Sequence, residues 1–146
     1  LRWRTGTVSA IFLEHVIEHV TPAEAWRFFE ECWRVLRPGG VLRVSFPCLE
    51  QAWREMTPAF AEAIRRKGWG DGTPRTALRS LIVEHEHRAA WSAGAMRAVL
   101  EAQGFTVTQH PVGESNDPAM RDLEQHWTQV GREANAVGTA CLEARR

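Results

Sequence analysis

The chain lacks net charge, long apolar runs and a basic tract. Its 18 Lys and Arg residues balance 18 Asp and Glu residues, and no window interleaves basic with aromatic side chains. Because nucleic-acid binding depends on a positive surface, this balance argues against a nucleic-acid partner. No segment approaches the roughly 18 apolar residues of a membrane helix, and the amino end has no signal-peptide pattern. We expect no nucleic-acid and no membrane partner.

Cysteine is also scarce, with three residues at positions 32, 48 and 141. The count is odd and the spacing is wide, which is not the pattern of a disulfide framework. We expect reduced thiols and a cytoplasmic location. The 146 residues, 44% of them hydrophobic, suit one compact domain over 1–146. Because the first residue is Leu1, we also consider a processed chain or a piece of a longer one.

Residues 12–47 carry the most informative pattern, FLEHVIEHVTPAEAWRFFEECWRVLRPGGVLRVSFP. Thr21 followed by Pro22 and, three residues after the cap, by Glu24 predicts a helix that begins with a capping box. The Pro-Gly-Gly segment at 38–40 ends that helix, and the apolar run 41–46 predicts a strand covered on both faces. With a further strand over 8–13, this block predicts a β-α-β crossover.

Two segments of this block resemble a known family. HVIEHV at 15–20 and RVLRPGG at 34–40 are similar to signatures of the class I S-adenosylmethionine-dependent methyltransferases, in the branch called type 11. The resemblance implies an α/β, Rossmann-like methyltransferase sheet with helices on both faces. It also implies S-adenosylmethionine as the cofactor and methyl transfer to a small molecule, with a sugar or glycan precursor as the expected acceptor.

The rest of the chain predicts a helical insertion over 49–84 and then a second α/β stretch. Helices are expected at 58–67, at 75–84 and after the cap Ser92, with a strand following Gly104. A further helix is expected around 117–127 and a last strand over 137–144. By resemblance, the insertion would cover the acceptor side of the site.

The amino-terminal half of the family's sheet is missing from this sequence. There is no glycine-rich turn after a first strand and no acidic residue ending a second strand, the features that hold the cofactor in such folds. We therefore expect a truncated domain that contains the carboxy-terminal portion of the fold, with about four strands. A homo-oligomer or a second chain would supply the missing half, and catalysis by this chain alone is doubtful.

The end of the first strand is the predicted cofactor edge, because ligands of open α/β sheets sit outside the carboxyl ends of the strands. By resemblance, the backbone at Leu13 and Glu14 lines the cofactor and the side chain of His15 points toward the methyl group or the acceptor. For His15, the competing interpretation is a residue that only caps the strand.

Methyl transfer to a hydroxyl needs a general base, a task suited to histidine near neutral pH. His15 and His87 are the candidate catalytic residues. Arg88 is a candidate for binding an acidic or phosphorylated acceptor, and Glu114 matches the resembled group as a second substrate-binding residue. A surface hydrogen-bonding cluster is the structural alternative for His87, and a local turn is the alternative for Glu114.

Two other classes of function remain open from the sequence. His15, Glu18 and His19 have the spacing of an inverted zinc-peptidase motif, but its ligands must share one helix, and a new helix begins at Pro22. We therefore expect no metal. The second alternative is a non-catalytic, methyltransferase-like interaction module, which the missing glycine loop favours.

Overall fold

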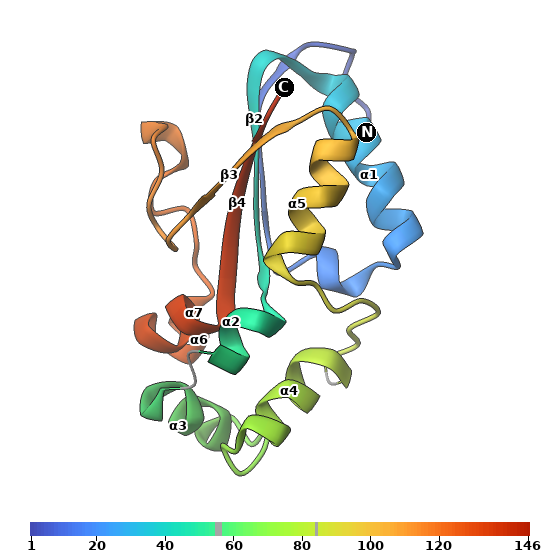
Figure 1. Cartoon of the computed structure of the whole chain (residues 1–146). Coiled ribbons are helices and arrows are strands. Elements are labelled where there is room, and N and C mark those ends of the chain that lie inside the picture. Colours follow the sequence, from blue (N-terminus) through green and yellow to red (C-terminus); the bar gives the residue numbers. More distant parts are fainter. Residues whose placement is uncertain (55–56, 84) are drawn as a thin grey trace.

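The computed structural model describes residues 1–146 except 55, 56 and 84. These three positions belong to the helical insertion expected over 49–84. At these positions the expectation falls outside the described residues. The described residues form a four-stranded mixed sheet with its helices on one face and at one end (Figure 1). The predicted α/β class and the four strands are confirmed. The expectation of helices on both faces is wrong, because a loop covers the second face.

The sheet has the strand order β1-β2-β4-β3. β1 and β2 are parallel, whereas β4 runs antiparallel to both of its neighbours. The parallel pair with an intervening helix is the expected β-α-β unit. The strands span β1 (Val8–Glu14), β2 (Leu36–Pro47), β3 (Thr106–His110) and β4 (Thr139–Arg145).

Two capped helices cover one face of the sheet. In α1 (Pro22–Val35), the Thr21 side chain accepts a hydrogen bond from the backbone N–H of Glu24, and the Glu24 carboxylate accepts one from the N–H of Thr21. This is the capping box that the sequence predicts. Ser92 caps α5 (Ala93–Ala102) in the predicted way, by accepting from the N–H of Ala95.

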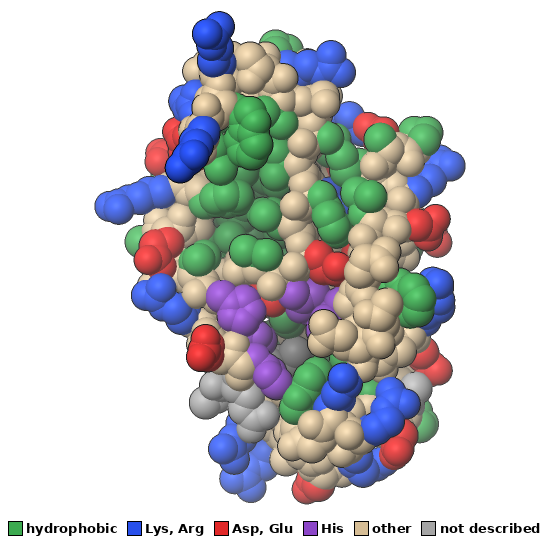
Figure 2. All heavy atoms as spheres, turned by 180° about the vertical axis from the view of Figure 1, so that it is seen from behind, with side chains coloured by type: hydrophobic (Ala, Val, Ile, Leu, Met, Phe, Trp, Pro, Cys, Tyr) green, Lys and Arg blue, Asp and Glu red, His purple; other side chains and the backbone are tan. Residues whose placement is uncertain are grey.

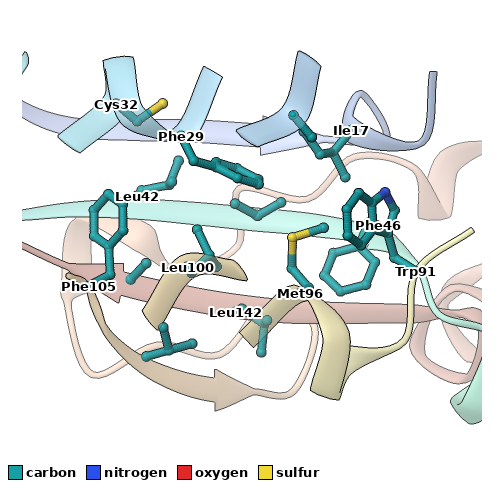
Figure 3. Packing of buried hydrophobic residues seen from close by; sticks show 14 of the residues in the cluster. Ile17, Phe29, Cys32, Leu42, Phe46, Trp91, Met96, Leu100, Phe105 and Leu142 are labelled. Carbon is teal, nitrogen blue, oxygen red and sulfur yellow. The ribbon is translucent and has the colours of Figure 1, made fainter. Parts of the chain in front are cut away.

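The main core lies between these two helices and the sheet (Figure 3). Phe29 of α1 and Met96 and Leu100 of α5 pack on side chains of β2 and β4, and all of them are buried. Burial of this apolar surface holds β1 and β2 in place. The three cysteines are buried and free, which confirms the expected absence of a disulfide.

The opposite face of the sheet is covered by the loop segment 111–126, whose only helical part is the 3-10 turn η2 (Pro118–Met120). The helix expected over 117–127 is therefore wrong. The loop is attached to the sheet by the fully buried Arg43, which donates hydrogen bonds to Glu124 (2.6 Å) and to Glu143 (2.8 Å). These long-range contacts override the local helix signal.

A second group of helices lies beyond the carboxyl ends of β1 and β2, at the bottom of Figure 1. The last strand begins at Thr139 and not at Val137, because α7 continues to Gly138. Within the described parts of the chain, every helix is too short or too polar to span a bilayer. The elements at this end are η1 (Ile17–His19), α2 (Leu49–Arg54), α3 (Pro58–Arg66), α4 (Pro74–Val83), α6 (Trp127–Val130) and α7 (Arg132–Gly138).

Candidate functional site

A cavity of about 270 Å³ lies where the carboxyl ends of β1 and β2 meet the second group of helices. Five of the chain's six histidines line it. In Figure 2 they gather around a hollow below a broad apolar surface. Apart from the carboxylate of Glu18, the remaining lining residues are apolar or uncharged polar, as in small-molecule sites. The five histidines are His15, His19, His85, His87 and His126.

His15 is the residue that follows β1, and its backbone and ring are both held. Its N–H donates to the carbonyl of Ser45 (2.9 Å), and its φ is +49°, an uncommon conformation for a residue other than glycine. Its Nδ1 lies 3.2 Å from Oε1 of Glu18, and its Nε2 lies 3.4 Å from the hydroxyl of Thr139. The strained turn places the ring of His15 at the wall of the cavity.

His126 stacks on His15, with ring centroids 3.9 Å apart. Burial, followed by the nearby His15, lowers the pKa of His126 to about 4. His126 is therefore uncharged near neutral pH. No sequence pattern marks His126, which lies 111 residues from His15 in a segment without a motif.

Glu14 fastens the covering loop to the end of β1. Its carboxylate accepts hydrogen bonds from the backbone N–H groups of Gln125 and His126 at 2.8–2.9 Å. Leu13 pairs with Val44 across the sheet and packs on the main core. Both residues stand at the strand end where the sequence places the cofactor edge, but the Glu14 side chain is already bound within the chain.

The predicted acceptor residues divide into two groups. His87 lines the cavity together with His15, whereas Arg88 and Glu114 are not among its lining residues. The Arg88 side chain is 53% exposed and bonds to Glu24 (3.1 Å) outside the cavity. Glu114 is exposed, and its carbonyl accepts a hydrogen bond from Arg43 on the far face of the sheet (3.0 Å).

The peptidase geometry is absent from this turn. His15 precedes the short 3-10 helix Ile17–His19, so the side chain of His15 does not share a helix with the side chains of Glu18 and His19. The inverted zinc-peptidase motif requires that shared helix. The alternative of a zinc peptidase therefore has no support in the structure.

For a methyl-donor cofactor, the described residues form only one wall. The turn after β1 contains no glycine, and it leads directly into η1. The carboxylate nearest to the strand end, that of Glu14, is occupied by Gln125 and His126. The residues that are present thus fit part of such a site, and the cofactor's ribose and carboxyl groups need residues from elsewhere.

The first 44 residues match a family model described as a methyltransferase domain. No curated protein matches the sequence. Solved structures with a similar fold include an S-adenosylmethionine-dependent methyltransferase from Archaeoglobus fulgidus, at a TM-score of 0.56 and 11% identity, in which the match covers 99% of this chain and 62% of the other.

Two further structures are similar at the same TM-score of 0.56. One is an S-adenosylmethionine-dependent methyltransferase from Mesorhizobium loti, at 15% identity, covering 100% of this chain and 65% of that one. The other is a putative methyltransferase from Haloferax volcanii in complex with a methyltransferase activator, at 15% identity, covering 99% of this chain and 56% of that one. The chain therefore spans less than two thirds of the length of these proteins.

Residues 1–44 thus match the methyltransferase domain model, and the fold of the whole chain is similar to part of the fold of S-adenosylmethionine-dependent methyltransferases.

Proposed function

We propose that this chain forms the acceptor-binding part of an S-adenosylmethionine-dependent methyltransferase, with His15 as the general base. The observation that carries the proposal is the position of His15. In a methyltransferase-like fold, its ring lies at the carboxyl end of β1 and enters a cavity that the same strand ends help to build. The cofactor, when bound, supplies a methyl group that is activated by a sulfonium charge.

The contacts of His15 suit proton transfer from a hydroxyl. Glu18 lies beside Nδ1 (3.2 Å), so the carboxylate favours a proton on this nitrogen and leaves Nε2 as the acceptor. Nε2 faces the hydroxyl of Thr139 at 3.4 Å, which marks the place that an acceptor hydroxyl would take. A positioned base of this kind contributes about 10²- to 10⁴-fold to a rate.

The cavity suits a small, hydroxyl-rich acceptor, such as a sugar or glycan precursor. Its volume of about 270 Å³ has room for a small molecule. Trp69 and Phe60 supply apolar surface, whereas Thr139 and Asn135 supply hydrogen-bonding groups. Such mixed linings bind ligands that have both ring faces and hydroxyls. Phe60 and Trp69 belong to the insertion 49–84, which would roof the acceptor.

The missing part of the cofactor site would be placed along the outer edge of β1. Among the described strands, β1 pairs only with β2, and its other edge has no strand beside it. Apolar residues of intermediate burial line this edge strand, including Ile11 and Leu13. We propose that the glycine-rich half of the fold, from a segment outside these 146 residues or from a second chain, pairs here. Unpaired edges with apolar residues favour such pairing.

The test is calorimetric titration of the metal-stripped chain with S-adenosylmethionine and S-adenosylhomocysteine, with the mass and oligomeric state measured in the same sample. Micromolar binding by the monomer or by an oligomer would support the proposal. A well-folded sample that binds neither compound in any oligomeric form would exclude further copies of this chain as the source of the missing half.

The role of His15 is tested separately, with the monomer or oligomer that binds the cofactor. His15→Gln should leave the affinity for S-adenosylhomocysteine unchanged but lower the rate of methyl transfer by about 10²-fold or more. His110→Gln, which changes a histidine outside the cavity, is the matched control and should keep full activity. Equal rates for His15→Gln and the control would remove His15 from the mechanism.

A further inference from the structure

Glu18 is a buried carboxylate that is short of hydrogen bonds. Its side chain is 3% exposed; Oε1 lies 3.2 Å from Nδ1 of His15, and Oε2 accepts no hydrogen bond from a described residue. A buried charge that lacks hydrogen bonds is costly, so native structures rarely leave one without compensation. The groups around this carboxylate therefore show what it is arranged to bind.

Imidazoles surround that carboxylate. The Nε2 of His19 lies 4.0 Å from Oε1 of Glu18, and the rings of His19 and His87 meet edge to face with centroids 4.9 Å apart. One ligand atom from each of Glu18, His19 and His87 lies within 4.8 Å of the others. Two imidazoles and a carboxylate are donors that bind divalent transition metals and zinc in particular.

The backbone holds these three side chains together. The carbonyl of Glu18 accepts hydrogen bonds from the N–H groups of Arg88 (2.8 Å) and Ala89 (3.1 Å). This pair of bonds fastens the segment that follows His87 to the turn that carries Glu18 and His19. The grouping thus joins residues almost 70 positions apart in the sequence, through contacts that do not involve their side chains.

We propose that Glu18, His19 and His87 bind one divalent transition metal ion, with zinc as the expected species. In a tetrahedral zinc site, bonds of about 2.0–2.2 Å place ligand atoms roughly 3.4 Å apart, so these side chains would close by about 1 Å on binding. The fourth position would remain open to water or to a small ligand in the cavity. His19 is 42% exposed, which gives the ion a path from solvent.

This site differs from the peptidase motif and from the proposed methyl transfer. His15 is not in the group of three, and His87 replaces it. The proposal requires no cofactor and no completing half of the sheet, so failure of one proposal leaves the other standing. The sequence predicts no metal, because the inverted zinc-peptidase motif needs one shared helix and a new helix begins at Pro22.

The test uses the chain prepared without a polyhistidine tag, stripped with a chelator and titrated calorimetrically with zinc chloride. We expect saturable binding of one zinc per chain. His19→Ala, His87→Ala and Glu18→Gln should each weaken it by about 100-fold or more, beyond the effect typical of residues that only support a metal ligand. His110→Gln is the matched control, because His110 lies outside the cavity, and it should bind as tightly as the original chain.

Two further measurements make the outcome decisive. Zinc should raise the melting temperature of the chain and of His110→Gln but not that of His19→Ala, because a ligand stabilises only the folded state that binds it. Magnesium, which prefers oxygen ligands, should not bind. Absence of zinc binding by the folded chain, equal loss in His110→Gln, or equal binding of magnesium would each overturn the proposal. Since the His19 side chain is partly exposed, its variant should fold.

Discussion

The imidazole rings of His15 and His126 are stacked with an interplanar angle of 26° and centroids 3.9 Å apart. His15 directly follows β1, and His126 is the last residue of the loop that covers the far face of the sheet. Glu14 binds the backbone N–H of the same His126 (2.9 Å), so strand end and loop end are fixed side by side. The floor of the cavity is therefore built from two parts of the chain that are distant in sequence.

The stack predicts a pH dependence of stability. Burial, followed by the nearby His15, lowers the pKa of His126 to about 4 in the folded chain, whereas an unfolded histidine titrates near about 6.5. Between these values the unfolded chain takes up a proton and the folded chain does not. The stabilisation is therefore fully present above about pH 6.5 and is lost as the pH falls toward about 4.

Urea unfolding measured at several pH values checks this prediction. His126→Phe keeps a ring on His15 but cannot be protonated, so its free energy of unfolding should fall less between pH 6.5 and pH 4.5 than that of the original chain. A His126 ring that titrates near pH 6.5 by NMR in the folded chain would disprove the predicted shift.

The sequence predicted best those features whose signals are local. Thr21 and Glu24 form the capping box within one helical turn, and Ser92 caps α5 three residues before its partner. Such bonds depend on neighbours along the chain, so spacing alone reveals them. The parallel β1-β2 pair followed from the same block, because a helix between two apolar strands leaves few other arrangements.

Features that depend on distant contacts escaped prediction. The sequence predicts an apolar strand over 41–46, yet Arg43 is fully buried there and binds Glu124, which lies 81 residues away. That bond holds the loop 111–126 across the sheet and prevents the expected helix. His126 reaches His15 through the same loop, so its place in the cavity had no local signal.

The capping box predicts a measurable loss of stability. Thr21→Ala removes the side chain that accepts from the Glu24 N–H and should lower the free energy of unfolding by about 1 kcal/mol. Thr21→Ser keeps a hydroxyl and is the control, expected within a few tenths of the original chain. Urea unfolding measures both, and equal losses in the two variants would show that the hydroxyl bond contributes nothing.

The two glycines that end the RVLRPGG segment differ in the space available for a side chain. A Cβ on Gly40 would lie 2.9 Å from the carbonyl oxygen of Arg37 and 3.2 Å from that of Ser9, which are backbone atoms that cannot move aside. Gly39 has open space but a φ of +75°. Gly40→Ala should therefore cost roughly 1–3 kcal/mol through overpacking.

The comparison at Gly39 separates backbone strain from crowding. Gly39→Asn should cost little, because Asn tolerates positive φ, whereas Gly39→Ala should cost about 1 kcal/mol. Thermal unfolding of Gly40→Ala, Gly39→Ala and Gly39→Asn gives the order of their stabilities. If Gly40→Ala proved as stable as Gly39→Asn, the close approach of the β1 backbone at Ser9 would be disproved.

The buried Arg43 makes the strongest prediction about stability. Its guanidinium holds both Glu124 (2.6 Å) and Glu143 (2.8 Å), and all three side chains are at most 3% exposed. Burial raises the pKa of Glu124, but the hydrogen bonds from Arg43 and Ser45 outweigh it, so the net pKa lies below the usual range. Arg43→Ala leaves two buried carboxylates without their cation and should cost about 3–5 kcal/mol.

Arg145→Ala is the control for this substitution, because Arg145 pairs with Asp117 (3.3 Å) while its side chain is 43% exposed. A pair so exposed contributes about 0–1 kcal/mol. Urea unfolding should therefore separate the two variants by several kilocalories per mole. Arg43→Ala should also recover stability as the pH is lowered to values at which the two carboxylates bind protons, relative to the original chain at the same pH. Similar losses in both arginine variants would show that the buried ion cluster does not hold the loop 111–126 on the sheet. The contacts of Arg43 would then not explain why the helix expected at 117–127 does not form.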